Sequence, residues 1–161
     1  MNKLSLIPAA TVLMIRDIDD EIEVLMVKRS KKPPFENLFV FPGGKIDEAD
    51  KDINISNLCD GLDDKEASKK LGLSHGGLSY WVACVRECFE EVGILLAKKT
   101  NGEDLDLTGF EKEKYDKYRD KLIRNEISFY DICIKEDLKL TMHNIAPFSH
   151  WITPDIETKR F

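Results

Sequence analysis

The most constraining feature of the sequence is a cluster of three glutamates, Glu87, Glu90 and Glu91, in a segment with the apolar period of an α-helix. At about 100° per residue, one stripe of this helix carries the apolar side chains of Val82, Val85, Phe89 and Val92. The glutamates fall on the opposite side, where Glu87 neighbours both of the others at spacings of three and four. Gly93 is expected to end the helix.

Three like charges this close together repel one another, and the helix alone leaves two interpretations of them open. One is a solvated acidic face, as charge runs usually are. The other is a site for a divalent cation, because hard cations such as Mg²⁺ take carboxylate oxygens as ligands. The net charge of −6 argues against general nucleic-acid binding. A substrate with phosphate groups would need a cation or a local basic patch.

A second stretch, Phe41-Pro-Gly-Gly-Lys-Ile-Asp-Glu-Ala-Asp50, precedes the acidic helix. Together with Arg86-Glu-Cys-Phe-Glu-Glu-Val-Gly-Ile94, it resembles the signature of the Nudix hydrolases. That signature, the Nudix box, is Gly, five residues, Glu, seven residues, and Arg-Glu-apolar-x-Glu-Glu-x-Gly-apolar. Gly44 is its first glycine, and residues 86–94 match every specified position of the second half. Two departures are Asp50, where the family usually has Glu, and a spacer of residues 51–85 in place of seven.

The resemblance implies one α/β (α+β) domain over residues 1–161, with a mixed β-sheet sandwiched between helices. Residues 51–78 are interpreted as an insertion within the Nudix box, a small helical hairpin in a surface loop, which costs little closure entropy. In it, residues 63–71 are predicted to form a helix that Gly72 ends. Ser79 is the candidate N-cap of the acidic helix.

The remaining elements follow from the patterns of apolar and charged residues. Apolar, β-branched runs predict strands at residues 9–16, 23–28, 38–41, 138–142 and 148–154, with a turn at 17–20. Residues 110–124 and 127–134 are predicted to be helices, and residues 98–108 a polar loop. In the branch that the chain looks like, the sequence continues well past Trp151-Ile-Thr-Pro154. We therefore expect the C-terminal part of the domain to be missing.

The resemblance also implies the roles of the residues in the signature. Glu87 and Glu91, and then Glu90, would hold Mg²⁺ or Mn²⁺ for the hydrolysis of a diphosphate bond. The main chain of Gly43 would lie beside the metal. Arg86, the fourth residue assigned to the catalytic set, is expected to pair with an acidic neighbour and to orient the helix.

Asp50 is expected to be a structural carboxylate, or one that supports the metal ligands. The resemblance assigns no general base, because the family recruits it from varied positions.

Substrate contacts are predicted at two places upstream of the acidic helix. Lys28-Arg-Ser-Lys-Lys32 is the densest basic cluster of the chain, and it is either a solvated loop or a phosphate contact. Arg29 is favoured over Lys28 for that contact, because its planar fork binds phosphate through two hydrogen bonds. Gly43 and Gly44 form either a tight turn or a close main-chain approach to the metal and phosphate.

Three further stretches are similar to the branch with the peroxisomal acyl-coenzyme A diphosphatases and their bacterial relatives. These are Ala9-Ala-Thr-Val, Leu25-Met-Val-Lys-Arg-Ser30 and Trp151-Ile-Thr-Pro154. The coenzyme A signature is only partly matched. Coenzyme A or acyl-coenzyme A is therefore the first substrate hypothesis. The alternatives are ADP-ribose, a dinucleoside polyphosphate or an oxidised nucleotide, or a binding module without turnover.

The cysteines and the hydropathy indicate the cellular setting. Cys59, Cys84, Cys88 and Cys133 include no Cys-x-x-Cys pair, which argues against a zinc knuckle or a thioredoxin motif. No apolar run approaches eighteen residues, and the N-terminus has no secretory pattern. We expect a cytoplasmic protein with a small nucleotide-type substrate and without nucleic-acid or membrane partners. The oligomeric state is not assigned.

Overall fold

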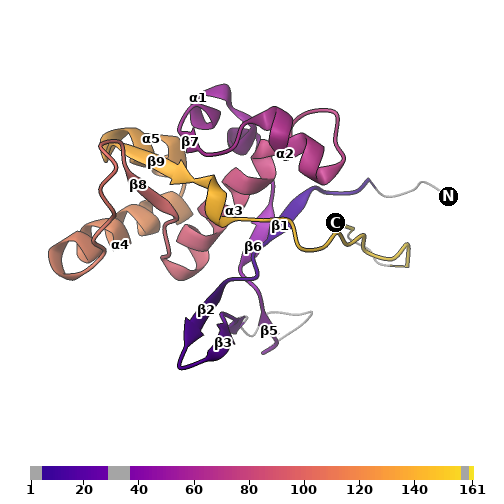
Figure 1. Ribbon diagram of the computed structural model, residues 1–161, viewed down its shortest axis with the longest axis horizontal. Helices are drawn as coiled ribbons and strands as arrows, with labels where there is room; N and C mark the ends of the chain where they lie inside the picture. Colours follow the sequence, from indigo (N-terminus) through magenta and orange to yellow (C-terminus); the bar gives the residue numbers. More distant parts are fainter. Residues whose placement is uncertain (1–4, 29–36, 157–159) are drawn as a thin grey trace.

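Helix α3 (Leu78–Val92) is the central element of the computed structural model, which describes residues 5–28, 37–156 and 160–161. The other helices lie around it, and the paired strands β1 and β6 cross it on one side (Figure 1). Its buried residues run from Leu78 to Phe89. The helix is therefore enclosed over most of its length.

The predicted apolar stripe of α3 is confirmed, because Val82, Val85 and Phe89 are fully buried. Val92, at the end of the stripe, is half-buried. The opposite side is less exposed than the pattern indicated. Ala83 and Cys84 pack on that side against Ala10 of β1 (Ala9–Thr11).

The main core lies on the Phe89 side of α3. Helix α4 (Gly109–Ile123) and helix α5 (Phe129–Lys135) supply much of it, and the ring centroids of Phe89 and Phe129 are 6.4 Å apart. Both helices were predicted, with boundaries one or two residues away. Strand β9 (Leu138–Thr141), also predicted, buries Leu138 and Leu140 in the same core.

The strands of the described residues form four small sheets, whereas the sequence predicted one mixed sheet between helices. Antiparallel pairs join β1 to β6 (Gly43–Lys45), β2 (Ile15–Ile18) to β3 (Glu21–Val24), and β4 (Val27–Lys28) to β5 (Phe39–Val40). The fourth sheet is mixed. In it, β9 pairs in parallel with β7 (Cys59–Asp60) and antiparallel with β8 (Ala97–Lys99).

The β2–β3 hairpin projects away from the helical body (Figure 1). Asp19 and Asp20 connect its strands with φ of 49° and 67°, as a two-residue hairpin turn with positive φ at both positions requires. The predicted turn at 17–20 is thus present but shorter. The predicted strand 9–16 is divided between β1 and β2, and the predicted strand 23–28 between β3 and β4.

Residues 51–78, predicted to be an insertion, contain α1 (Ile53–Ser56), β7 and α2 (Asp64–Leu71), and the 3₁₀ helix η1 (Glu48–Lys51) leads into them. The prediction for α2 is confirmed: the Asp63 side chain caps its start, and Gly72 ends it in the left-handed conformation. The prediction of a surface hairpin is wrong in one respect. Ile55 and Ala67 are buried in the main core, and β7 belongs to the mixed sheet.

The start of α3 differs from the prediction that Ser79 is its N-cap. Gly77 occupies that position, and Ser79 lies inside the helix, where its hydroxyl donates to the Gly76 carbonyl. The carboxylate of Asp64 in α2 instead accepts hydrogen bonds from the main-chain N–H groups of Leu78 and Gly76. These bonds lower the pKa of Asp64. A side chain of α2 therefore caps the N-terminus of α3.

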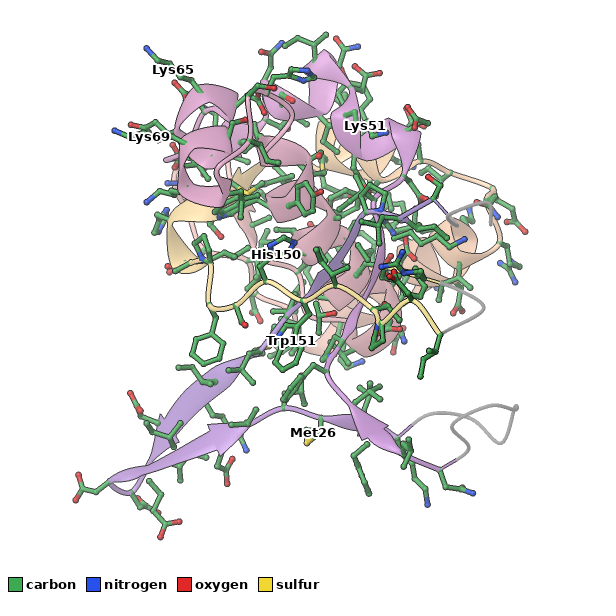
Figure 2. All side chains as sticks on the ribbon, turned by 90° about the vertical axis from the view of Figure 1, so that its right-hand side faces the viewer. Met26, Lys51, Lys65, Lys69, His150 and Trp151 are labelled. Atoms are coloured by element: carbon green, nitrogen blue, oxygen red, sulfur yellow. The ribbon has the colours of Figure 1, made fainter. Side chains whose placement is uncertain are left out.

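Two further segments differ from the prediction. Residues 98–108, predicted to be a loop, contain part of β8, and Lys98 bridges to Asp104. Residues 148–154, predicted to be a strand, have no regular structure. Trp151 on this segment is 84% exposed, and Figure 2 shows it beside His150. Within the described ranges, no helix combines the length and the apolar character needed to cross a membrane.

We expect Phe89→Ala to lower the free energy of unfolding by about 3–5 kcal/mol, because the ring is fully buried and leaves a cavity. Urea unfolding measures this loss. Phe110→Ala is the matched control, since that ring is 77% exposed on α4. Similar stabilities for the two variants would contradict the assigned facing of α3.

Candidate metal-binding active site

The glycine stretch and the acidic helix meet, as the sequence predicted. The main-chain N–H of Gly43 donates a hydrogen bond of 3.0 Å to Oε2 of Glu91. This contact spans 48 positions of the chain. It places the first strand residue of β6 directly beside the last turns of α3.

Both glycines allow this approach for steric reasons. Gly43 has a φ of 154°, and a Cβ there would overlap the carbonyl oxygen of Ala10 in β1. A Cβ on Gly44 would overlap the carboxylate of Glu87. The interpretation of Pro42-Gly-Gly44 as a tight turn is therefore wrong, because both glycines lie in β6. They make room for β1 on one side and for Glu87 on the other.

Arg86 of α3 and Asp50 of η1 form a buried ion pair next to Glu87 and Glu90. The guanidinium Nε and Nη2 each donate a hydrogen bond of 2.9 Å to one oxygen of the Asp50 carboxylate. Arg86 is 5% exposed and Asp50 2%. The predicted acidic partner of Arg86 is thus Asp50, and the structural role expected of Asp50 is confirmed.

The same guanidinium donates hydrogen bonds to three more groups. Nη2 donates to the main-chain carbonyl of Lys45 at 2.9 Å, and Nη1 donates to Oε1 of Glu87 at 2.9 Å and of Glu90 at 3.2 Å. Burial alone would lower the pKa of Arg86, but its hydrogen bond to Asp50 and the surrounding carboxylates raise it. The side chain therefore stays charged and offsets the repulsion between the glutamates.

The three glutamates differ in exposure. The side chain of Glu87 is 12% exposed and that of Glu90 25%, whereas Glu91 is an exposed residue. All three lie opposite the apolar stripe, as predicted, but the interpretation as a fully solvated acidic face fits only Glu91. Burial raises the pKa of Glu87, and Arg86 acts in the opposite direction. A carboxylate desolvated in this way is stabilised by added positive charge.

The donor chemistry of the site fits a hard divalent cation. Glu87, Glu90 and Glu91 each have one oxygen that makes no hydrogen bond or ion pair with the described residues. Carboxylate oxygens are the ligands that Mg²⁺ and Mn²⁺ prefer. Among the described ranges, no three acidic, histidine or cysteine side chains are already gathered around one point. The assignment of a metal therefore depends on the type of donor.

Sequence reasoning missed Arg119 of α4. Its Nε donates to the main-chain carbonyl of Glu90 at 2.8 Å, and its Nη2 donates to that of Glu91 at 2.9 Å. No local pattern could have found it, because it is one cation in a strongly charged helix and its partners are main-chain atoms.

The predicted phosphate contacts stay predictions. Arg29 lies outside the described residues. Lys28 is exposed at the end of β4, where it pairs with Phe39, and no described hydrogen bond or ion pair joins it to α3.

The cysteines take no part in the site chemistry. All four are free, and burial raises the pKa of each thiol to about 12. They are therefore neutral at physiological pH. Cys84 and Cys88 on α3 act as small apolar side chains, as predicted.

The fold and the site define a class of α/β domains in which an Arg-Glu-x-x-Glu-Glu helix packs against a glycine strand. The model of the NUDIX domain matches residues 6–156, and the chain belongs to this family.

Two similar proteins can be compared with the chain. It is 31% identical to acyl-coenzyme A diphosphatase NUDT19 of Xenopus laevis, over 88% of the chain and 45% of that protein. The chain thus spans less than half the length of this relative. A crystal structure of a NUDIX hydrolase from Alicyclobacillus acidocaldarius matches with a TM-score of 0.73 and 22% identity, over 98% of the chain and 66% of that protein. The second comparison supports the fold.

We expect Asp50→Asn to lower the free energy of unfolding by about 3–5 kcal/mol, because a buried guanidinium loses its counter-charge. Denaturant titration measures the loss. Glu48→Gln is the control: it removes a carboxylate whose side chain is 90% exposed and pairs with Lys51. A small effect in both variants would show that the buried pair does not hold η1 to α3.

The two glycines should respond differently to alanine. Gly43→Ala should unfold the domain or destabilise it strongly, because the new Cβ meets main-chain atoms of β1 at a positive φ. Gly44→Ala should keep most of the stability, since only the end of the Glu87 side chain must move. Its divalent-cation affinity should fall. Thermal unfolding and calorimetry with Mn²⁺ measure the two effects, and wild-type affinity in Gly44→Ala would contradict the placement of Glu87.

Proposed function

We propose that the chain hydrolyses the diphosphate bond of coenzyme A or acyl-coenzyme A, giving adenosine 3′,5′-bisphosphate and (acyl-)phosphopantetheine. The observation that carries this proposal is the contact of Glu91 with the Gly43 N–H at 3.0 Å, beside two further glutamates that Arg86 holds. The substrate class is supported by the relative that is named an acyl-coenzyme A diphosphatase.

In the proposed reaction, the oxygen of a water molecule forms a bond to one phosphorus and releases a proton to solvent, while the bond from that phosphorus to the bridging oxygen breaks. The second phosphate leaves with the electron pair of that bond. Glu87, Glu90 and Glu91 would hold Mg²⁺ or Mn²⁺, which neutralises phosphate charge and lowers the pKa of bound water.

The protein's own groups would position these participants. Arg86, fixed by Asp50, keeps Glu87 and Glu90 side by side in spite of their like charges. The Gly43 N–H fixes Glu91. Because Gly44 has no side chain, the carboxylate of Glu87 can lie directly against β6. Positioning of this kind is most of what phosphoryl transfer asks of a protein.

Phosphate recognition is assigned to the basic cluster. Lys28 is exposed at the end of β4, and Arg29 follows it in the chain. In this proposal Arg29 binds phosphate through two parallel hydrogen bonds and Lys28 adds charge.

A second substrate class is favoured by the incomplete coenzyme A signature. ADP-ribose or a dinucleoside polyphosphate would use the same metal helix. A panel of these compounds with Mg²⁺, scored by product release, separates the classes. Release of adenosine 3′,5′-bisphosphate from coenzyme A is the expected result.

The panel is repeated with Glu91→Gln, which should lose metal-dependent hydrolysis and keep its thermal stability, because the change is isosteric and the side chain is exposed. Glu113→Gln is the matched control on the exposed side of α4 and should retain full activity. Full activity in Glu91→Gln would remove it from the catalytic set. Turnover of another nucleotide alone would reject coenzyme A, and absence of both turnover and Mg²⁺ binding would favour a binding module.

A further inference from the structure

Main-chain carbonyls at the C-terminal end of α3 accept hydrogen bonds from a side chain of another helix, Arg119 of α4. The last four carbonyls of an α-helix have no partner within the helix. Of the carbonyls of residues 89–92, that of Phe89 accepts from the Gly93 N–H at 3.0 Å, and the Ile94 N–H donates at 3.3 Å to that of Cys88, just before them. The next two, those of Glu90 and Glu91, accept from the guanidinium of Arg119 at 2.8 and 2.9 Å.

Arg119 contacts the main chain of the two residues whose carboxylates belong to the proposed metal site. Its Nε and Nη2 are parts of one rigid planar group, so the two hydrogen bonds fix the two carbonyls relative to each other. The guanidinium also places a positive charge at the negative end of the helix dipole. The side chains of Glu90 and Glu91 instead contact Arg86 and Gly43.

Helix α4, which carries Arg119, is anchored in the core. Tyr115, Tyr118 and Leu122 of α4 are buried in the main core, so the helix cannot shift freely. Beside the guanidinium, a hollow of about 160 Å³ is lined in part by Val92, Gly93 and Arg119. This side of the end of α3 is therefore open to solvent, and the hydrogen bonds of Arg119 restrain it there.

We propose that Arg119 is a positioning residue, which fixes the last turn of α3 so that Glu90 and Glu91 present their carboxylates to a divalent cation. This inference rests on the proposed function of the glutamates as metal ligands. Groups that orient metal ligands typically change metal affinity by about 10- to 100-fold when they are lost.

The test compares Arg119→Met, Arg119→Lys and the control Lys117→Met with the wild type. Arg119→Met keeps an unbranched stem and loses both donors. Arg119→Lys keeps the charge but lacks the planar fork. Lys117 is an exposed cation of the same helix and has no described contact with α3. Three quantities are measured: Mn²⁺ affinity by calorimetry, amide hydrogen exchange at Gly93 and Ile94, and kcat and KM for coenzyme A.

In Arg119→Met the dissociation constant for Mn²⁺ should rise about tenfold or more, and exchange at Gly93 and Ile94 should accelerate. The kcat should fall while KM for the substrate changes little. Arg119→Lys should lie between Arg119→Met and the wild type, and Lys117→Met should match the wild type.

Wild-type Mn²⁺ affinity and wild-type exchange in Arg119→Met would overturn the proposal. A loss of affinity that disappears at a lower temperature, where the variant is fully folded, would also overturn it, because the residue would then be only structural. The proposed function fails separately, if the wild type hydrolyses no coenzyme A. The Mn²⁺ and exchange comparisons need no turnover, so together they decide on Arg119 in that case too.

Discussion

The pair of Arg86 and Asp50 is the interaction on which the site depends. It joins residues 36 positions apart, and both side chains are buried. A buried ion pair costs desolvation energy, and its geometry must be good to offset that cost. Here two parallel hydrogen bonds of 2.9 Å meet the carboxylate, and the remaining donors reach Lys45, Glu87 and Glu90. The two halves of the Nudix box are thereby held together across the inserted segment, and the repulsion within the acidic cluster is reduced.

The acidic turn of α3 is held by three contacts of different kinds. Arg86 contacts side chains from below, Gly43 contacts the Glu91 carboxylate through its main-chain N–H, and Arg119 contacts main-chain carbonyls from α4. Each contact comes from a different element of the fold. A site that must hold like charges side by side requires such restraint, because the charges would otherwise drive the side chains apart into solvent.

The sequence predicted those features that depend on residues close together in the chain, namely the helices, their ends and the spacing of the glutamates. Helix α3 follows from its apolar period of 3.6 and α2 from the charges at its two ends, and Gly72 and Gly93 end these helices as predicted, because each of these signals acts within a few residues. The Arg-Glu-x-x-Glu-Glu spacing likewise placed the glutamates together on one helix. The strands were harder, because a strand needs a partner that its own residues do not specify. Residues 148–154 have a suitable composition but no described partner strand, whereas lysine-rich β8 pairs with β9. The role of Arg119 was not predicted for the same reason, because its hydrogen-bond partners are main-chain carbonyls of residues distant in the chain.

The parallel pairing of β7 with β9 limits how far the segment between the two halves of the box can be shortened. The segment between the two halves of the box, residues 51–85, is part of the folded body. Its strand β7 (Cys59–Asp60) pairs with Leu140 and Thr141 of β9, some eighty positions further along the chain. A loop that only covers the surface can be shortened at little cost, but a segment that supplies a sheet edge and interior side chains cannot. Its excision would strip β9 of one neighbour and open the interior at Ile55 and Ala67. The segment between the two halves of the box is therefore a structural requirement of this domain.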